Sequence, residues 1–286
     1  MGPHPGQLGR GEAGHGKVAR QRMQPSLSRF TVGRFGQRGF ERAYWFNLHS
    51  NDFFAPYEMY EGNSMIQAGG EGYYLTDDLT RLFNMLSGYA PDASFKSLLV
   101  SPNGVREGLT ERIEREIEFH EAGKPARIQI KVNSLVDEQI IDSLYRASQA
   151  GVPVDVLVRG MCALKPGVPG LSENIRVRSV LGRYLEHSRV FTFAGGGDPE
   201  IFIGSADMMH RNLDRRVEAL VRIAQPDHIK ELQDLFALAM SDDSSSWHLE
   251  TNGTWSRHQF DANGKKLIDV QDELMRFTSS RRSTRK

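Results

Sequence analysis

Basic and polar residues that suit phosphate binding stand at the ends of predicted strands. Arg159 directly follows an apolar, β-branched stretch, and Lys131 and Asn133 lie two residues apart, on one side of the strand that contains them. The planar guanidinium group of arginine matches the oxygens of a phosphate. An alternative role for Arg159 is to neutralise carboxylates at the edge of a sheet.

A histidine, His187, stands between two arginines, Arg183 and Arg189. Neighbouring positive charges favour the neutral imidazole, which can act as a base or a nucleophile near neutral pH. The alternative is a structural histidine held by Glu186 or by a backbone carbonyl. Spacing alone slightly favours the structural role.

The sequence Gly204-Ser205-Ala206-Asp207 predicts a turn, and Arg211 follows it closely. A Gly-Ser turn exposes backbone N–H groups and a hydroxyl, which arginines can complete into an anion-binding site. The alternative is a plain connection between two strands. Together these groups supply hydrogen-bond donors and a histidine, without paired acids or the spacing of metal ligands. They favour phosphate handling over hydrolysis by carboxylates.

The elements that position these residues follow from apolar periodicity. Residues 126–133 predict a strand, 137–151 a helix and 152–158 a second strand. This order predicts a βαβ unit with parallel strands that are covered on both faces. Ligands of open α/β sheets bind beyond the carboxyl ends of the strands, which is where Arg159 stands.

Other segments extend this α/β pattern on both sides. Turn residues at 195–198 and 251–253 predict two hairpins. The further predicted helices span 75–86, 109–118, 228–240 and 268–277, and the further predicted strands span 95–100, 175–180, 189–193, 200–203, 215–223, 247–249 and 254–256.

The first part of the chain lacks such a pattern. Residues 1 to about 50 are rich in Gly, Arg and Gln, contain only the acids Glu12 and Glu41, and keep no helical or strand period. Such a segment buries too little apolar surface to offset its ordering entropy. We expect a disordered leader, or sequence that was never selected to fold, in preference to a basic tail that binds nucleic acid or polyphosphate. The aromatic-rich residues 44–74 also lack a period.

The composition excludes several classes of protein. The 286 residues carry a formal net charge of zero, so nothing global indicates binding to nucleic acid. The single cysteine, Cys162, excludes an internal disulfide and a Cys-based zinc site, and fits a reducing cytoplasm. The sequence contains no run of 18 apolar residues and therefore predicts no membrane span.

Several motifs, in order, resemble the C-terminal half of bacterial polyphosphate kinase, from about Leu75 to the C-terminus. The motifs that carry the resemblance are Lys131-Val132-Asn133-Ser134-Leu135-Val136-Asp137, Val158-Arg159-Gly160-Met161-Cys162, Tyr184-Leu185-Glu186-His187-Ser188-Arg189 and Ser205-Ala206-Asp207-Met208-Met209. The resemblance implies a phospholipase-D-like α/β fold, with a mixed sheet flanked by helices.

The family transfers the terminal phosphate of ATP reversibly to polyphosphate, through a phosphohistidine and with Mg²⁺. The resemblance therefore implies ATP, ADP and polyphosphate as partners, Mg²⁺ as cofactor, a homo-oligomer, and a cytoplasmic location with membrane association left open. It makes His187 the family's second conserved histidine, which helps in proton transfer, and Arg159 a nucleotide- or phosphate-contacting arginine. The residues predicted to bind ATP or phosphate are Arg159, His187, Lys131, Asn133, Arg189, Ser205, Asp207 and Arg211, with His187 as the catalytic one.

The sequence departs from the family pattern at its start. The motif of the phosphorylated histidine has no match in residues 1–74, where His4, His15 and His49 have other neighbours. We expect 1–74 to be an unmatched leader, 75–100 a remnant of the first C-terminal catalytic domain, and 101–286 the second. No ligands for Mg²⁺ can be identified.

Three functional hypotheses follow from this sequence. The first is a truncated and impaired polyphosphate kinase, and the second a non-catalytic module that binds polyphosphate or nucleotide. A phosphodiesterase of phospholipase-D type is disfavoured, because Arg189 stands two residues after His187, where that class has a lysine.

Overall fold

The computed structural model describes residues 71–88, 94–102 and 104–284. Contacts between residues divide the chain after Tyr73, and the described fold belongs to the unit that runs from Tyr74 to Lys286. The prediction of a disordered leader falls, up to residue 70, outside the described residues.

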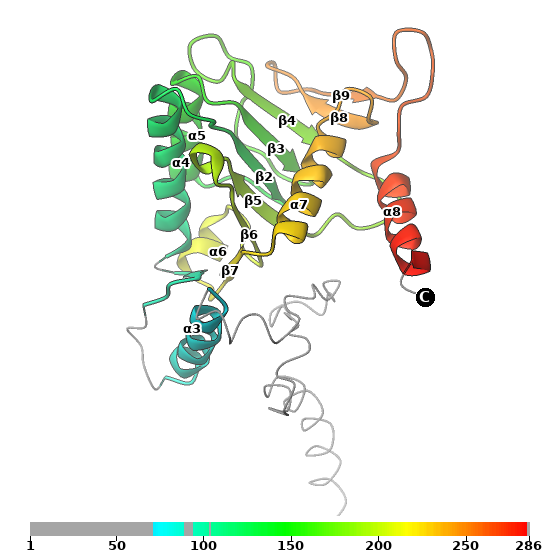
Figure 1. The fold of residues 1–286 in the computed structure, drawn as a ribbon. Coiled ribbons are helices and arrows are strands. Elements are labelled where there is room, and N and C mark those ends of the chain that lie inside the picture. The colour runs from blue at the N-terminus through cyan, green and yellow to red at the C-terminus, as the bar shows by residue number, and fades with distance from the viewer. Residues whose placement is uncertain (1–70, 89–93, 103, 285–286) are drawn as a thin grey trace, which may run out of the picture. The chain divides into compact units, whose positions relative to one another are not determined.

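Within the described residues, nine strands form one mixed sheet in the order β1-β7-β6-β5-β2-β3-β4-β8-β9 (Figure 1). The neighbours β2, β3 and β4 run parallel, and the other neighbouring pairs are antiparallel. The strands are β1 (Leu98–Val100), β2 (Ile128–Val132), β3 (Val154–Val158), β4 (Ile175–Ser179), β5 (Arg189–Phe193), β6 (Glu200–Gly204), β7 (Ala219–Ile223), β8 (Ser246–Leu249) and β9 (Trp255–His258).

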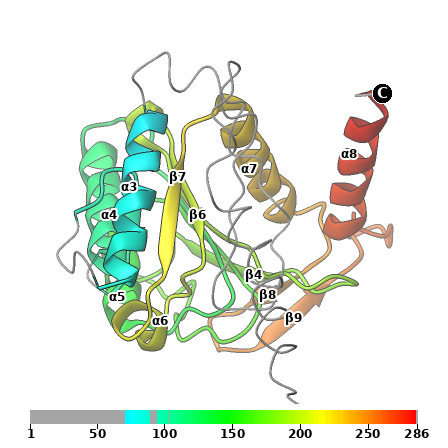
Figure 2. The ribbon, with the colours of Figure 1, turned by 90° about the horizontal axis from the view of Figure 1, so that it is seen from below.

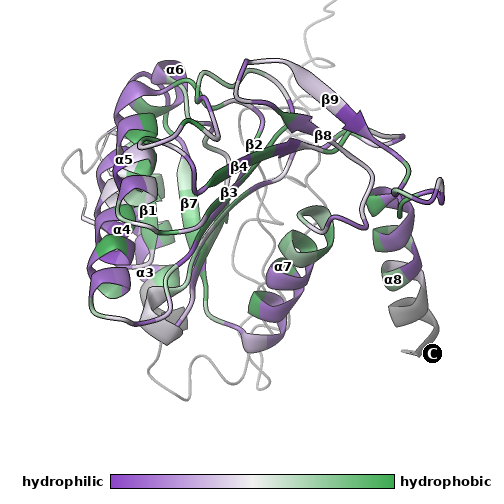
Figure 3. Ribbon diagram, turned by 90° about the horizontal axis from the view of Figure 1, so that it is seen from above, coloured by the Kyte–Doolittle hydropathy of each residue, from purple (hydrophilic) through white to green (hydrophobic). Residues whose placement is uncertain are grey.

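Helices flank this sheet on both faces. The helices α4 and α5 lie on one face and α7 on the other, while α8 stands beyond α7 (Figures 2 and 3). The predicted α/β class, a mixed sheet flanked by helices, is thereby confirmed. The helices are α3 (Glu71–Leu86), α4 (Val105–Glu121), α5 (Glu138–Gln149), α6 (His210–Asp214), α7 (Pro226–Ala239) and α8 (Val270–Thr284), and a 3₁₀ turn, η1, spans Gly195–Gly197. Of the helices in the described ranges, none combines the length and apolar character that crossing a membrane requires.

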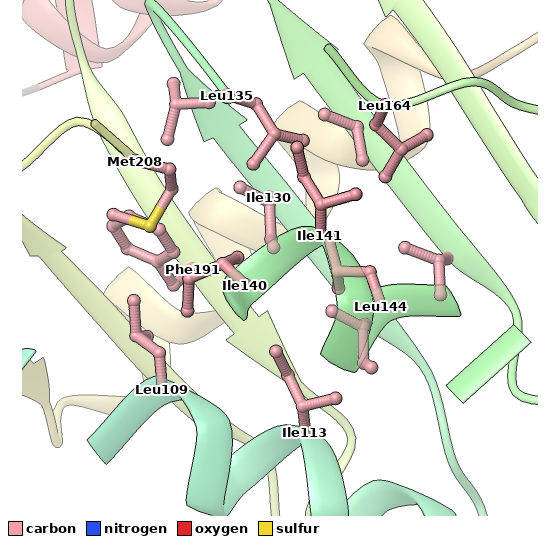
Figure 4. Close-up of a cluster of buried hydrophobic side chains, with 14 of the residues drawn as sticks. Leu109, Ile113, Ile130, Leu135, Ile140, Ile141, Leu144, Leu164, Phe191 and Met208 are labelled. Carbon is pink, nitrogen blue, oxygen red and sulfur yellow. The ribbon is translucent and has the colours of Figure 1, made fainter. Parts of the chain in front are cut away.

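The main apolar core lies between the sheet and the helices α4 and α5 (Figure 4). Because side chains alternate along a strand, Ile128, Ile130 and Val132 of β2 face this core, and Gln129 and Lys131 face the other side. Phe191 of β5 and Ile113 of α4 are fully buried in it. Burying a side chain of this size stabilises the fold by about 1.5–3 kcal/mol. This layer therefore fixes the strands whose ends carry the predicted site residues.

Several predicted strands are shorter in the structure, and local hydrogen bonds accompany the loss in two of them. The predicted strand 95–100 is reduced to β1, because the buried carboxylate of Asp78 accepts hydrogen bonds from the backbone N–H groups of Lys96 and Ser97. The predicted strand 215–223 is reduced to β7, and Glu218 just before it instead accepts a side-chain hydrogen bond from Asn212. β1 pairs with β7 at the edge of the sheet. The division of the chain at residue 100 stays a prediction.

The predicted βαβ unit and both hairpins are present. β2 and β3 run parallel, with Val132 opposite Val158, and α5 connects them. β5 and β6 form the hairpin around η1, with Arg189 opposite Gly204. β8 and β9 form the second hairpin.

Candidate functional site

The ends of four neighbouring strands lie side by side and form the polar edge of the sheet. The parallel strands β2 and β3 end there, at Val132 and Val158. β5 is antiparallel to β2 and therefore begins at this edge, with Arg189, and β6 returns antiparallel to β5 and ends beside it, at Gly204. Polar segments far apart in the sequence are thus brought together by the strand directions.

The buried carboxylate of Asp207 links three of these strand ends. Its Oδ1 accepts hydrogen bonds from the backbone N–H groups of Asn133, at 2.7 Å, and Ser134, at 3.3 Å. Its Oδ2 accepts from Arg189, at 2.9 Å, and from the Asn133 amide, at 3.2 Å. Burial opposes the ionised form, but Arg189 and the hydrogen bonds outweigh burial and lower the pKa of Asp207. Asp207 is therefore an anion that holds the end of β2 and the start of β5 in place.

Gly204 lets the chain enter this turn. A Cβ atom at Gly204 would lie 2.0 Å from the backbone oxygen of Ala219, so only glycine allows β6 to approach β7 this closely. The next residue, Ser205, bonds to the same neighbour, because its N–H donates to the Ala219 oxygen and its Oγ accepts from the Ala219 N–H. Ser205 thus fixes the turn that carries Asp207.

The guanidinium group of Arg159 is oriented by neutral acceptors. Its Nε donates to Asn133 Oδ1 at 2.9 Å, and one terminal nitrogen lies 3.3 Å from His187 Nδ1. Across the described parts of the chain, Arg159 makes no ion pair with a carboxylate. Its side chain is half-buried. The hydrogen bonds therefore orient a partly desolvated positive charge that has no carboxylate partner among the described residues.

The contact with Arg159 indicates the tautomer of His187. A guanidinium group has only N–H donors, so the imidazole nitrogen that faces it must accept. In the neutral imidazole the proton is then on Nε2. A protonated ring would direct an N–H at the guanidinium group, so the geometry suits the neutral form.

The ammonium group of Lys131 contacts the segment that carries His187. It donates to Ser188 Oγ at 2.8 Å and pairs with Glu186 at 2.9 Å. Burial lowers the pKa of Lys131, and the charge of Glu186 acts in the opposite direction. Lys131 therefore binds both sequence neighbours of His187.

A pocket opens beside this cluster. Its empty volume is about 350 Å³, counted with space that is open to solvent. One wall is polar, and α7 and α8 supply apolar side chains to the other. Its lining includes Lys131, Arg159 and Glu186 together with Leu235 and Ala239 of α7 and Val270 and Leu274 of α8.

Comparison with known proteins assigns the chain to a family. Residues 98–271 match the family model described as polyphosphate kinase C-terminal domain 2. The chain belongs to this family. The matched residues include the whole polar edge from Lys131 to Asp207.

Relatives in the polyphosphate kinase family agree with this assignment. The chain is 60% identical over 207 residues to polyphosphate kinase of Streptomyces coelicolor, which covers 72% of this chain and 28% of the relative. It is 50% identical over 203 residues to polyphosphate kinase of Mycobacterium tuberculosis, covering 69% of this chain and 27% of the relative. The chain thus spans about a quarter of the length of the curated relatives it matches.

A solved structure of the family has the same fold. The crystal structure of polyphosphate kinase from Porphyromonas gingivalis aligns with a TM-score of 0.69 at 36% sequence identity. The alignment covers 74% of this chain and 32% of that chain.

The structure brings most of the predicted site residues of this polyphosphate kinase domain together. Hydrogen bonds connect Asn133 with Arg159, Arg159 with His187, and Asp207 with Asn133 and Arg189. Lys131 is connected to the His187 segment through its hydrogen bond to Ser188, and Ser205 stands two residues before Asp207 in the same turn. Arg211 is exposed on α6 and makes no side-chain hydrogen bond to the others within the described ranges. The functional roles of all eight residues stay predictions.

Sequence reasoning missed three residues of this edge. Glu186 was considered only as a support for His187, but its carboxylate binds Lys131 and Gln271. Ser188 binds Lys131, and Gln271 reaches the edge from α8. No local pattern marks these partners, apart from the position of Glu186 and Ser188 on either side of the histidine.

Among the described residues, one cluster of side chains has distances that would suit a metal ion. Ligand atoms of Asp137, Glu138 and His210 lie within 4.8 Å of one another. These atoms already have partners, because Asp137 binds Arg106 and the N–H of Ile140, and His210 binds Glu138. The cluster is a network of ion pairs around the start of α5.

Proposed function

We propose that this domain binds the phosphate groups of ATP and polyphosphate at the edge formed by Arg159, His187, Lys131 and Asn133. It would thereby supply one wall of a site for reversible transfer of the ATP terminal phosphate to polyphosphate. The observation that carries the proposal is the guanidinium group of Arg159, which is oriented by Asn133 and His187 and has no carboxylate partner among the residues that the structure describes.

The electrostatic balance of the edge supports an anionic ligand. Three cations, Lys131, Arg159 and Arg189, face two carboxylates, Glu186 and Asp207. Counted over the described residues, and with a neutral histidine, these groups have one positive charge more than negative charges. A partly desolvated cation without a counter-ion is costly, and a phosphate oxygen that bonds to the guanidinium fork would remove this cost.

His187 is the residue that we propose to move a proton. Its Nδ1 accepts from Arg159, so Nε2 carries the ring proton and can donate a hydrogen bond to a phosphate oxygen; the ring can give up this proton only as Nδ1 takes up another. Binding of an anion to Arg159 would bring this oxygen beside the imidazole. This role matches that of the second histidine implied by the family resemblance.

The residues of the edge do not fit a magnesium ion held by the protein. Mg²⁺ prefers carboxylate oxygens and water. Both oxygens of Asp207 accept hydrogen bonds, and both oxygens of Glu186 are bonded, to Gln271 and Lys131. If the reaction uses Mg²⁺, this edge offers no free carboxylate pair to hold it among the described residues.

Binding of polyphosphate to the purified chain tests the proposal. We expect measurable affinity at low salt that decreases as the ionic strength rises, since charge–charge attraction is screened. Titration with a labelled polyphosphate at several salt concentrations measures it. No binding at low salt would refute the proposal.

A binding module without catalysis is the second candidate. It is favoured by the lack, in residues 1–74, of the motif that carries the family's phosphorylated histidine. Incubation of the chain with labelled ATP and Mg²⁺ should then give little phosphoenzyme and little polymer, although the chain binds polyphosphate. Robust polymer synthesis would contradict the hypothesis of a binding module without catalysis. Homo-oligomer formation and a cytoplasmic location stay predictions.

A further inference from the structure

The side-chain amide of Gln271, in the first turn of α8, binds the segment that leads to His187. Its Nε2 donates to the backbone oxygen of Tyr184 at 2.9 Å and to Glu186 Oε1 at 2.7 Å. Its Oε1 accepts from the backbone N–H of Tyr184 at 2.8 Å. Gln271 is buried, with 5% of its surface exposed, so these bonds are shielded from water.

The segment 181–186 has little other support. It belongs to no helix or strand, and none of its backbone groups bonds to another backbone group in the described parts of the chain. Leu181, Tyr184 and Leu185 are between 49% and 62% exposed. An exposed segment without backbone pairing would sample many conformations. The amide of Gln271 therefore restricts it.

The bonds of Gln271 continue to both neighbours of His187. Glu186 accepts from Gln271 through one oxygen and binds Lys131 through the other, at 2.9 Å. Lys131 in turn donates to Ser188 Oγ at 2.8 Å. The residues on either side of the histidine are thus connected to α8 and to β2.

The packing at Gln271 is tight as well as polar. A Cβ atom at Gly182 would lie 2.5 Å from Gln271 Oε1. Any larger residue at Gly182 would push the amide away from Tyr184. The segment and the amide are therefore matched in shape.

We propose that Gln271 is a positioning residue for His187. Through the backbone of Tyr184 and the Glu186–Lys131 pair, Gln271 holds the imidazole of His187 against Arg159. The inference rests on the proposed function for its catalytic meaning. It makes the docking of α8 a condition for an ordered histidine. It also assigns a role to the last residue of the segment that matches the family model.

The test uses Gln271→Met, which retains the length and packing of the side chain but removes its hydrogen bonds. Gln233→Met is the matched control, because Gln233 is an exposed glutamine in the middle of α7. Nitrogen-15 NMR of the histidine rings reports the tautomer of His187. We expect the Nε2–H tautomer alone in the wild-type chain and in the control, and a mixture of both tautomers in Gln271→Met.

Polyphosphate affinity is measured on the same samples. We expect it to fall about three- to tenfold in Gln271→Met, as for the loss of one hydrogen bond, and to stay unchanged in the control. Gly182→Ala should reproduce both effects by displacing the amide, and it replaces Gln271→Met if that variant does not fold.

The outcomes separate the two proposals. If the wild-type chain does not bind polyphosphate, the proposed function fails, and the tautomer comparison still decides whether Gln271 positions His187. An unchanged His187 spectrum in both variants overturns the inference, whatever the affinity does. A changed spectrum with wild-type affinity supports the positioning of His187 by Gln271 and refutes instead the proposed part of His187 in binding polyphosphate.

Discussion

Two buried carboxylates, Asp155 and Asp207, lie near opposite ends of the same sheet and are used differently. Asp155, near the start of β3, accepts from the side chains of Arg127 and Arg176. Asp207, beyond the end of β6, accepts from two backbone N–H groups and from Arg189. Both are less than a tenth exposed.

The difference lies in what remains for a ligand. At Asp155 the two arginines are half-exposed, and both form an ion pair with the same carboxylate. At Asp207 the carboxylate is satisfied by the backbone and by a buried arginine, and Arg159 nearby bonds to Asn133 and His187 but to no carboxylate among the described residues. At one end of the sheet both arginines are therefore engaged in ion pairs, whereas at the other Arg159 is oriented and has no carboxylate partner in the described part of the chain.

Removal of the two carboxylates should have unequal effects on stability. Asp207→Ala would leave Arg189 buried without its carboxylate, and we expect the free energy of unfolding to fall by about 3–5 kcal/mol. Asp155→Ala should cost about 1 kcal/mol, since Arg127 and Arg176 can turn into water. Urea unfolding of both variants measures this. Equal losses would contradict the distinction.

Arg159→Lys should separate charge from geometry. Lysine keeps the positive charge but has no planar fork, so it cannot bond to Asn133 and His187 as the arginine does. We expect polyphosphate affinity to fall up to about tenfold, as for one hydrogen bond lost, with the salt dependence retained. Arg176→Lys is the control. An unchanged affinity for Arg159→Lys would show that charge alone matters.

Acidification should loosen the β8–β9 hairpin before the polar edge. Burial, with the charges of Arg178 and His258, lowers the pKa of His248 from 6.5 to about 4. The unfolded chain therefore binds more protons at His248 between these values, and this contribution to stability is lost as the pH falls from 6.5 to about 4. The pKa of Asp207 is lowered from 3.8, so its contribution is lost only at lower pH.

Hydrogen exchange, corrected for its intrinsic pH dependence, compares the two regions between pH 7 and 4.5. We expect protection to decrease first in β8 and β9, and His248→Gln to remove this pH dependence. Simultaneous loss of protection at β2 and β8 would contradict the prediction.

The sequence was sufficient to predict which strand ends form the polar edge, but not which side chains bond to one another there. The parallel pair β2 and β3 and the hairpin β5–β6 follow from local periodicity, and their directions alone bring Asn133, Arg159 and Arg189 together. The partners of Asp207 and Gln271 could not be predicted. Gln271 lies 85 residues from Glu186, and only the tertiary fold determines which polar atom such a side chain meets.

Arg159, which has no carboxylate partner within the described ranges, is proposed to offer its charge to phosphate, whereas Arg176 is paired with Asp155. Polyphosphate affinity of Arg159→Ala and Arg176→Ala, measured at the same salt concentration, tests it directly. We predict that Arg159→Ala lowers the affinity about tenfold or more, as for lost hydrogen bonds to a charged group, and that Arg176→Ala changes it less than about twofold. Equal losses in the two variants, or no loss in Arg159→Ala, would contradict the claim.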